Sequence, residues 1–184
     1  MENSLKNLKV AVLATDGFEE SELTEPVKAL KEAGADVEVI SLKAGSIQGL
    51  HHYEKAVQIP VDRVLSEANP SDYQAVVLPG GAMNADALRS VPEVQRFIQA
   101  FKDKPMAVIC HAPWILVSAG LAKGRKLTSY HTIRDDITNA GGQWSNAEVI
   151  VDRNLVTSRQ PSDLPAFNRE MIKLFASSAE SKAA

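Results

Sequence analysis

The chain has little sulfur and no long run of apolar or like-charged residues. Its 184 residues include a single cysteine, which excludes an intramolecular disulfide and is typical of a reducing compartment. Lys and Arg number 20 against 23 Asp and Glu, a net charge of −3 without the basic run typical of nucleic-acid binding. No apolar segment approaches membrane length, and the first residues carry no apolar signal core. We therefore expect a cytoplasmic protein without a membrane or nucleic-acid partner.

The composition is that of an ordinary soluble domain. Apolar residues make up 45% of the chain and charged residues 23%. A chain of this length can bury a substantial core, and no linker or repeat divides it. We therefore expect one domain over residues 1–184, with an ordered core over 7–176. The small polar residues of 177–184 predict a flexible tail.

Buried strands alternate with amphipathic helices along the chain. Short apolar runs with β-branched residues predict strands, and apolar residues at helical spacing predict helices between them. The predicted strands are 9–14, 36–42, 56–59, 73–78, 106–109, 126–130, 148–152 and 155–158. The first predicted helix begins after residue 18 and ends at 33. The others span 61–68, 84–89, 92–103, 113–119, 133–139 and 162–176. This order predicts a three-layer α/β/α sandwich around a mostly parallel sheet with right-handed crossovers.

The lone cysteine, Cys110, lies where a core strand passes into a helix. The apolar run 106–109 precedes it, and apolar positions from Trp114 onward have helical spacing. Such a strand–turn–helix corner is typical of a nucleophile elbow, which exposes a side chain at the carboxyl edge of a sheet. A helix N-terminus favours ionisation of a thiol, and the adjacent His111 can move a proton near neutral pH. We therefore predict a reactive thiolate here, against the alternative of an inert buried cysteine.

Two further segments at the carboxyl ends of strands complete the candidate site. Gly80 and Gly81 allow backbone amides to approach a substrate, and the amides of Gly81 and His111 are candidates for an oxyanion hole. The alternative role of the glycine pair is a tight turn. Glu19 and Glu22 open the first predicted helix, where acids are commonly solvated. A carboxyl that faced the thiol would instead have a raised pKa and donate a hydrogen bond to sulfur.

The other histidines give weaker signals. His51 and His52 lie in an irregular segment near Glu54, but their spacing is not convincing for a metal site, so a surface loop is expected. His131 follows a predicted strand and is a candidate for lining the cleft, with simple burial as the alternative. We therefore predict no metal ion and no other cofactor.

Five motifs occur in order along nearly the whole chain: FEESEL at 18–23, VLPGG at 77–81, ICHAP at 109–113, LTSY followed by IRDD within 127–136, and EVIVD at 148–152. Together they resemble the PfpI family, the intracellular-protease branch of the superfamily that includes the parkinsonism-associated deglycase. The resemblance implies a flavodoxin-like fold related to class I glutamine amidotransferases. It also implies assembly as a homodimer or a homohexamer.

The resemblance also implies roles for individual residues. Cys110 would be the nucleophile and His111 its partner. Glu22 falls where the family places the acid that hydrogen-bonds the reactive thiol, and Glu19 is a secondary candidate. In hexamers of the family, an acid after the Gly-Gly turn of one subunit orients the histidine of another. The nearest match here is Asp86, which is one residue out of register and is an aspartate where a glutamate is common.

These residues predict a cofactor-independent cysteine enzyme of stress protection that attacks carbonyls. The family implies small aldehydes such as methylglyoxal, glycated amino groups or peptides as substrates. Glyoxalase or deglycase chemistry is favoured over peptidase chemistry, because a peptide needs a stronger nucleophile and a protonated leaving amine. The alternative is a redox sensor or chaperone-like stress protein that uses oxidation of the same cysteine. A glutaminase is disfavoured, because no histidine follows His131.

Overall fold

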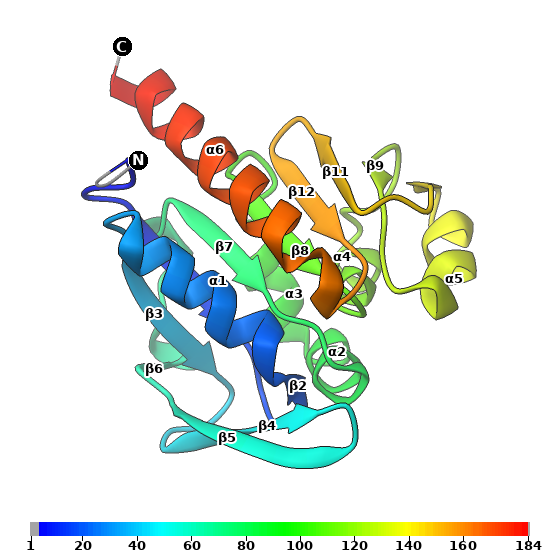
Figure 1. Cartoon of the computed structure of the whole chain (residues 1–184), viewed down its shortest axis with the longest axis horizontal. Coiled ribbons are helices and arrows are strands. Elements are labelled where there is room, and N and C mark those ends of the chain that lie inside the picture. The colour runs from blue at the N-terminus through cyan, green and yellow to red at the C-terminus, as the bar shows by residue number, and fades with distance from the viewer. Residues whose placement is uncertain (1–3, 184) are drawn as a thin grey trace.

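The central sheet of the computed structural model, which describes residues 4–183 and the side chains of 4–179, has seven strands. They are β1 (Lys9–Leu13), β3 (Asp36–Ser41), β6 (Arg63–Val64), β7 (Ala75–Leu78), β8 (Met106–Ile109), β11 (Val149–Asp152) and β12 (Leu155–Ser158). Their spatial order is β11-β12-β8-β7-β1-β3-β6 (Figure 1). Neighbouring strands pair in parallel, except that β11 runs antiparallel to β12 at one edge. The carboxyl ends of the parallel strands therefore meet along one edge of the sheet.

Helices cover both faces of this sheet, so the predicted three-layer α/β/α sandwich is confirmed. The helices are α1 (Glu20–Glu32), α2 (Ala82–Arg89), α3 (Pro92–Gln99), α4 (Pro113–Ser118), α5 (Arg134–Asn139) and α6 (Leu164–Ala183). α1 and α6 lie side by side on one face, and α3 and α4 cover the other (Figure 1). Each face has its own buried apolar cluster, with Leu23 and Phe167 in one and Phe97 and Leu116 in the other. Among the described helices, none is long and apolar enough to cross a membrane.

Two small sheets and four short 3₁₀ turns complete the fold. β2 (Phe18–Glu19), β4 (Ser46–His51) and β5 (Glu54–Pro60) form one sheet, and β9 (Lys126–Leu127) and β10 (Gln143–Trp144) form the other. The 3₁₀ turns are η1 (Leu65–Glu67), η2 (Pro70–Asp72), η3 (His131–Ile133) and η4 (Pro161–Asp163). The strand expected over 56–59 lies within β5, and the segment before it that was expected to be irregular supplies β4 and the tip of the β4–β5 hairpin. The pairing of β4 with β2 places the hairpin tip beside the start of α1.

The predicted helix over 61–68 is wrong, because this segment adds an edge strand to the main sheet. Arg63 and Val64 pair with Ile40 and Ser41 of β3. The Arg63 guanidinium also donates to both carboxylate oxygens of Glu38, at 3.0 and 3.2 Å. These partners lie more than 20 positions away in the sequence, so local periodicity does not report them.

Two other predicted elements have different ends in the structure. The strand expected over 126–130 stops at Leu127, because the Thr128 N–H donates to the Thr157 hydroxyl at 3.0 Å instead of continuing a ladder. The last helix begins at Leu164, two residues after its predicted start. It continues through the segment 177–183 that was expected to be a flexible tail. The Ser178 hydroxyl donates to the Leu174 carbonyl within this extension, at 3.0 Å.

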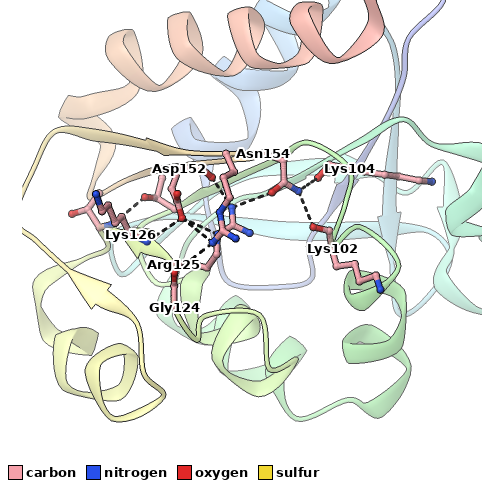
Figure 2. Close-up of polar contacts among 10 residues, drawn as sticks. Lys102, Lys104, Gly124, Arg125, Lys126, Asp152 and Asn154 are labelled. Atoms are coloured by element: carbon pink, nitrogen blue, oxygen red, sulfur yellow. Dashed lines mark hydrogen bonds and ion pairs between the residues drawn. The ribbon is translucent and has the colours of Figure 1, made fainter. Parts of the chain in front are cut away.

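A half-buried polar network fixes the amino end of β8 (Figure 2). The Arg125 guanidinium donates to the Asp152 carboxylate at 2.9 Å and to the Asp152 carbonyl at 2.6 Å. Asn154 donates to the Lys104 carbonyl at 2.6 Å, and its own carbonyl accepts from the Met106 N–H at 2.8 Å. We call Arg125, Asp152 and Asn154 the clasp. It holds the start of the strand whose far end carries Cys110.

Candidate active site

Cys110 lies at a sharp corner directly after β8. Its φ is +64°, in the left-handed region that residues other than glycine seldom adopt. The corner is held from two sides, because the Cys110 N–H donates to the Ser158 carbonyl at 3.0 Å and its carbonyl accepts from the Tyr130 N–H at 2.8 Å. Pro113 then begins α4 without losing a hydrogen bond. The geometry is that of the predicted elbow.

A cleft of about 750 Å³ opens over the thiol. Five of the predicted site residues line it, namely Glu19, Glu22, Gly81, Cys110 and His111. Its mouth includes two side chains that are far more exposed than is usual for large apolar residues, Tyr53 at 97% and Met83 at 65%. The Cys110 residue is 7% exposed, so the thiol is recessed at the base of an open cleft and is not sealed in the core.

The Glu22 carboxyl is fully buried and faces the thiol. The Cys110 thiol and the Gly80 N–H lie close to it, but neither makes a hydrogen bond of good geometry to the carboxyl oxygens. Burial, and next the negative charge of Glu19, raise the pKa of Glu22 to about 8. Glu22 is therefore protonated at neutral pH, as predicted for an acid that faces the sulfur.

The shift in the pKa of the Cys110 thiol has the opposite sign from the one predicted. Burial raises this pKa, and a negative charge on Glu22 would raise it further. The backbone N–H groups of Gly81 and His111 act against this rise without cancelling it. α4 has only six residues, and its contribution does not outweigh the loss of solvation. The resting thiol is therefore protonated, and its reactivity requires a base.

His111 is in position to be that base. Its Nδ1 lies 3.3 Å from the Cys110 sulfur, and its Nε2 lies 3.3 Å from the Thr132 hydroxyl oxygen. The ring stacks on Tyr130 with a centroid separation of 4.7 Å and an interplanar angle of 27°. Burial, and next the nearby His131, lower the pKa of His111, so the imidazole is neutral at neutral pH and can accept a proton.

The Gly80–Gly81 turn is held by a side chain that sequence reasoning missed. Asn84 is fully buried, and its amide donates to the carbonyls of Pro79 and Gly80 at 3.0 and 3.1 Å. Its amide oxygen accepts from the Thr15 N–H at 2.8 Å. The available signal was an asparagine a few residues after a Pro-Gly-Gly turn. It is weak, because asparagine is common near helix starts for other reasons.

Replacing Gly81 with alanine is expected to destabilise the protein by about 3–5 kcal/mol, through left-handed strain and overpacking. Gly81 has a φ of +94°, and an added Cβ would meet the backbone of Gly17, Phe18 and Glu19. The matched control is Gly120→Ala. Gly120 has a φ of +72° but open space around its Cβ position, so only the strain of about 1 kcal/mol applies. Urea unfolding of both variants measures the difference, and equal losses would contradict the crowding seen at Gly81.

Three predicted site residues do not line the cleft: Gly80, which lies beside Glu22 and Cys110, and Asp86 and His131, which lie farther out. Asp86 is exposed on α2. His131 is exposed as well, neither buried nor lining the cleft, and its ring packs on Tyr130 at 4.7 Å. Its neighbour Thr132 lines the cleft in its place. Within the described part of the chain, no group of three or more His, Cys, Asp or Glu residues could hold a metal ion.

The hairpin histidines were expected in a surface loop, and they lie at the exposed tip of the β4–β5 hairpin. The His52 N–H donates to the Glu19 carboxylate at 3.1 Å, so the tip is tied to the start of α1. His52 and the adjacent Tyr53 therefore form part of the cleft wall. Sequence reasoning missed this wall, because it depends on the pairing of β2 with β4.

Comparison with known proteins places this geometry in a family. The sequence model of the DJ-1/PfpI family matches residues 8–174. The chain belongs to the DJ-1/PfpI family. It is 46% identical over 168 residues to Deglycase TK1284 of Thermococcus kodakarensis, covering 91% of this chain and 99% of that protein. It is 41% identical over 170 residues to Protein/nucleic acid deglycase 2 of Escherichia coli, covering 90% and 96% of the two chains.

A solved structure agrees with the fold. It is a two-domain protein from Anabaena variabilis with a DJ-1/ThiJ/PfpI-like domain and a ferritin-like domain. The TM-score is 0.85 at 34% identity, over 91% of this chain and 48% of that longer chain. With the family and these relatives, the protein is an enzyme of the PfpI type.

Proposed function

We propose that this DJ-1/PfpI protein is a cofactor-independent cysteine enzyme of stress protection that acts on reactive aldehydes and on early glycated amino groups. The observation that carries the proposal is the 3.3 Å contact between the Cys110 sulfur and Nδ1 of a neutral His111, at the base of an open cleft. A thiol beside a neutral imidazole is the arrangement that nucleophilic attack on a carbonyl requires.

The proposed first step forms one carbon–sulfur bond. The Cys110 sulfur attacks the carbonyl carbon while the thiol proton passes to Nδ1 of His111. The electrons of the carbonyl π bond move to oxygen, where the N–H groups of Gly81 and His111 can stabilise the charge. Because Glu22 is protonated, it places no second negative charge beside the sulfur. The proton then returns from His111 to the carbonyl oxygen, which gives a hemithioacetal. For methylglyoxal, transfer of the aldehyde C–H hydrogen as a proton to the neighbouring carbonyl carbon turns the hemithioacetal into a thioester and the ketone into an alcohol, so one carbon is oxidised as the other is reduced. Water then cleaves the carbon–sulfur bond, which releases the hydroxy acid and restores the thiol without an external oxidant.

Aldehydes fit this site better than peptides. Addition to an aldehyde needs no leaving group, so a protonated thiol with one mild base is sufficient, whereas an amide needs a stronger nucleophile and a protonated amine. Two of the similar proteins carry the name deglycase, which supports glycated amino groups as a second substrate class. Peptide hydrolysis is the weaker proposal.

The site also weighs against a redox sensor. Sensor thiols have a low pKa and are open to solvent, because peroxide reacts with the thiolate. Cys110 is 7% exposed, and burial raises its pKa. The enzyme is therefore the better supported of the two functions.

We also propose a homo-oligomer, either a dimer or a hexamer, in the cytoplasm. The free thiol is compatible with a reducing compartment. The exposed Tyr53 and Met83 at the mouth of the cleft favour contact with another copy. Because Asp86 lies outside the cleft of its own chain, it can contribute to the site only from such a copy.

The experiment that tests the enzyme proposal replaces His111 with alanine. We expect turnover of methylglyoxal to fall about 100-fold or more, because general base catalysis contributes about 10²–10⁴-fold. His51→Ala, at the exposed hairpin tip, is the matched histidine control and should keep its turnover. Slow oxidation of Cys110 by peroxide is compatible with either function, so turnover is the measurement that separates them. Unchanged turnover in the His111 variant, with the fold intact, would exclude His111 as the base, and absence of turnover in the unsubstituted protein would favour the sensor over the enzyme.

A further inference from the structure

The second ring nitrogen of His111 has one hydrogen-bonding partner in the described part of the chain, and it is a hydroxyl. The Thr132 oxygen lies 3.3 Å from Nε2. Thr132 belongs to η3, and its side chain is exposed in the cleft wall. No carboxylate among the described residues makes a hydrogen bond or an ion pair with either ring nitrogen. The position that an acid would occupy beside a catalytic histidine is therefore taken by Thr132.

The two contacts of the ring fix its proton arrangement together. A neutral imidazole carries one N–H and one lone pair. Nδ1 can accept the thiol proton only if its lone pair faces the sulfur, which places the N–H on Nε2. The Thr132 oxygen is positioned to accept that N–H. After proton transfer the ring is an imidazolium, and the same oxygen still accepts from Nε2.

We propose that Thr132 is a positioning residue for His111: its hydroxyl oxygen accepts the Nε2–H, and this selects the tautomer whose Nδ1 lone pair faces the Cys110 sulfur. This inference rests on the proposed function, because it gives His111 the role of base. The hydroxyl keeps its own proton free to donate to a substrate oxygen in the cleft. One chain thus supplies both the base, His111, and the Thr132 hydroxyl, which orients that base and can also donate a hydrogen bond.

The remaining neighbours hold the ring plane but do not select the tautomer. Tyr130 stacks on one side of the ring, and Trp114 lies tilted at 5.6 Å. The titratable groups near His111 are Cys110, Tyr130 itself, the Glu22 carboxyl beyond the thiol, and His131 on the far side of Tyr130. Apart from Cys110, none of them makes a hydrogen bond to the ring within the described chain.

The test compares Thr132→Val with Thr132→Ser in the assembled protein. Valine keeps the shape and loses the hydroxyl, so we expect kcat for methylglyoxal to fall about 3- to 10-fold, the worth of one neutral hydrogen bond. Nitrogen-15 NMR of the His111 ring should show the Nε2–H tautomer in the unsubstituted protein and a mixture in the valine variant. The pKa of His111 should fall in this variant, because the imidazolium loses an acceptor. Serine should restore the tautomer, the pKa and kcat.

Thr138→Val is the control, because Thr138 is also exposed and hydrogen-bonded but lies in α5, where its hydroxyl donates to the Arg134 carbonyl. It should leave the tautomer of His111 unchanged. A valine variant at 132 with an unchanged tautomer, pKa and kcat would overturn the inference. So would a change of tautomer in Asp86→Asn but not in Thr132→Val, since an acid of a neighbouring copy would then orient the ring. These outcomes are separate from failure of the proposed function, which would appear as methylglyoxal turnover that does not require His111.

Discussion

Replacing Cys110 with serine is expected to lower kcat for methylglyoxal by at least about 10³-fold. An alcohol is a far weaker acid than a thiol, and the pKa of His111 is already lowered by burial. Within the described chain no acid contacts this imidazole to strengthen it as a base, so the site has no means of activating a hydroxyl. Disappearance of methylglyoxal, followed at saturating substrate, measures the loss.

The serine variant should remain folded, which makes the result interpretable. Serine has nearly the volume of cysteine, and the same corner can hold it because its backbone hydrogen bonds to Ser158 and Tyr130 are unaffected. Thermal unfolding checks this, and iodoacetamide labelling of the unsubstituted protein checks that Cys110 is reached through the cleft. Retention of a tenth or more of the turnover would place the nucleophile elsewhere.

Glu22→Gln is expected to have the largest effect on how the stability of the protein depends on pH. The pKa of Glu22 is about 8 in the folded protein and 4.5 without burial, so the folded state holds an extra proton between these values. The stability that this proton supplies is complete below pH 4.5 and is lost as the pH rises toward 8, a change of about 4–5 kcal/mol. Glutamine has no proton to lose. The free energy of unfolding should therefore fall less between pH 5 and pH 8.5 in the variant than in the unsubstituted protein.

The test compares how the free energy of unfolding changes with pH in the two proteins, because a buried glutamine can lower that free energy by the same amount at every pH. Glu25→Gln is the matched control. Glu25 lies on the same helix and is exposed, so its substitution should leave the pH dependence unchanged. Urea unfolding at the two pH values gives the four free energies needed. Equal slopes for Glu22→Gln and the unsubstituted protein would mean that Glu22 is ionised in the folded state across this range.

The layers of the fold were predictable because they depend on local patterns. The apolar runs of β1, β7 and β8 and the helical spacing of α3 each lie within a dozen residues. The errors arose where a distant partner decides the structure. Residues 61–68 have apolar spacing that suits a helix, yet Glu38 and the open edge of β3 hold Arg63 and Val64 as a strand. The hairpin register depends in the same way on β2.

The candidate site likewise has features set by the local sequence and features set by residues distant in the sequence. The elbow at Cys110 and the glycine turn were predictable, because a strand end, a turn and a helix start are contiguous in the chain. The sign of the thiol pKa shift was not, because it depends on how deeply packing buries Cys110 beside Glu22. Thr132 carries no sequence signal of its own, and the signal of Asn84 is weak. Only the folded chain shows that one faces His111 and the other holds the Gly80 carbonyl.

The two ends of β8 have opposite characters, and this has a consequence for how the protein can change. At the amino end, the clasp satisfies the side chains of Arg125 and Asn154 with hydrogen bonds. At the carboxyl end, Cys110 adopts a disfavoured backbone conformation beside a buried carboxyl without a well-formed partner. One end of the strand thus contributes to stability, and the other carries the reactive residue. Substitutions in the clasp should change the stability of the enzyme and leave its substrate preference unchanged. Substitutions that relieve the backbone strain at Cys110 should give a more stable but less active protein.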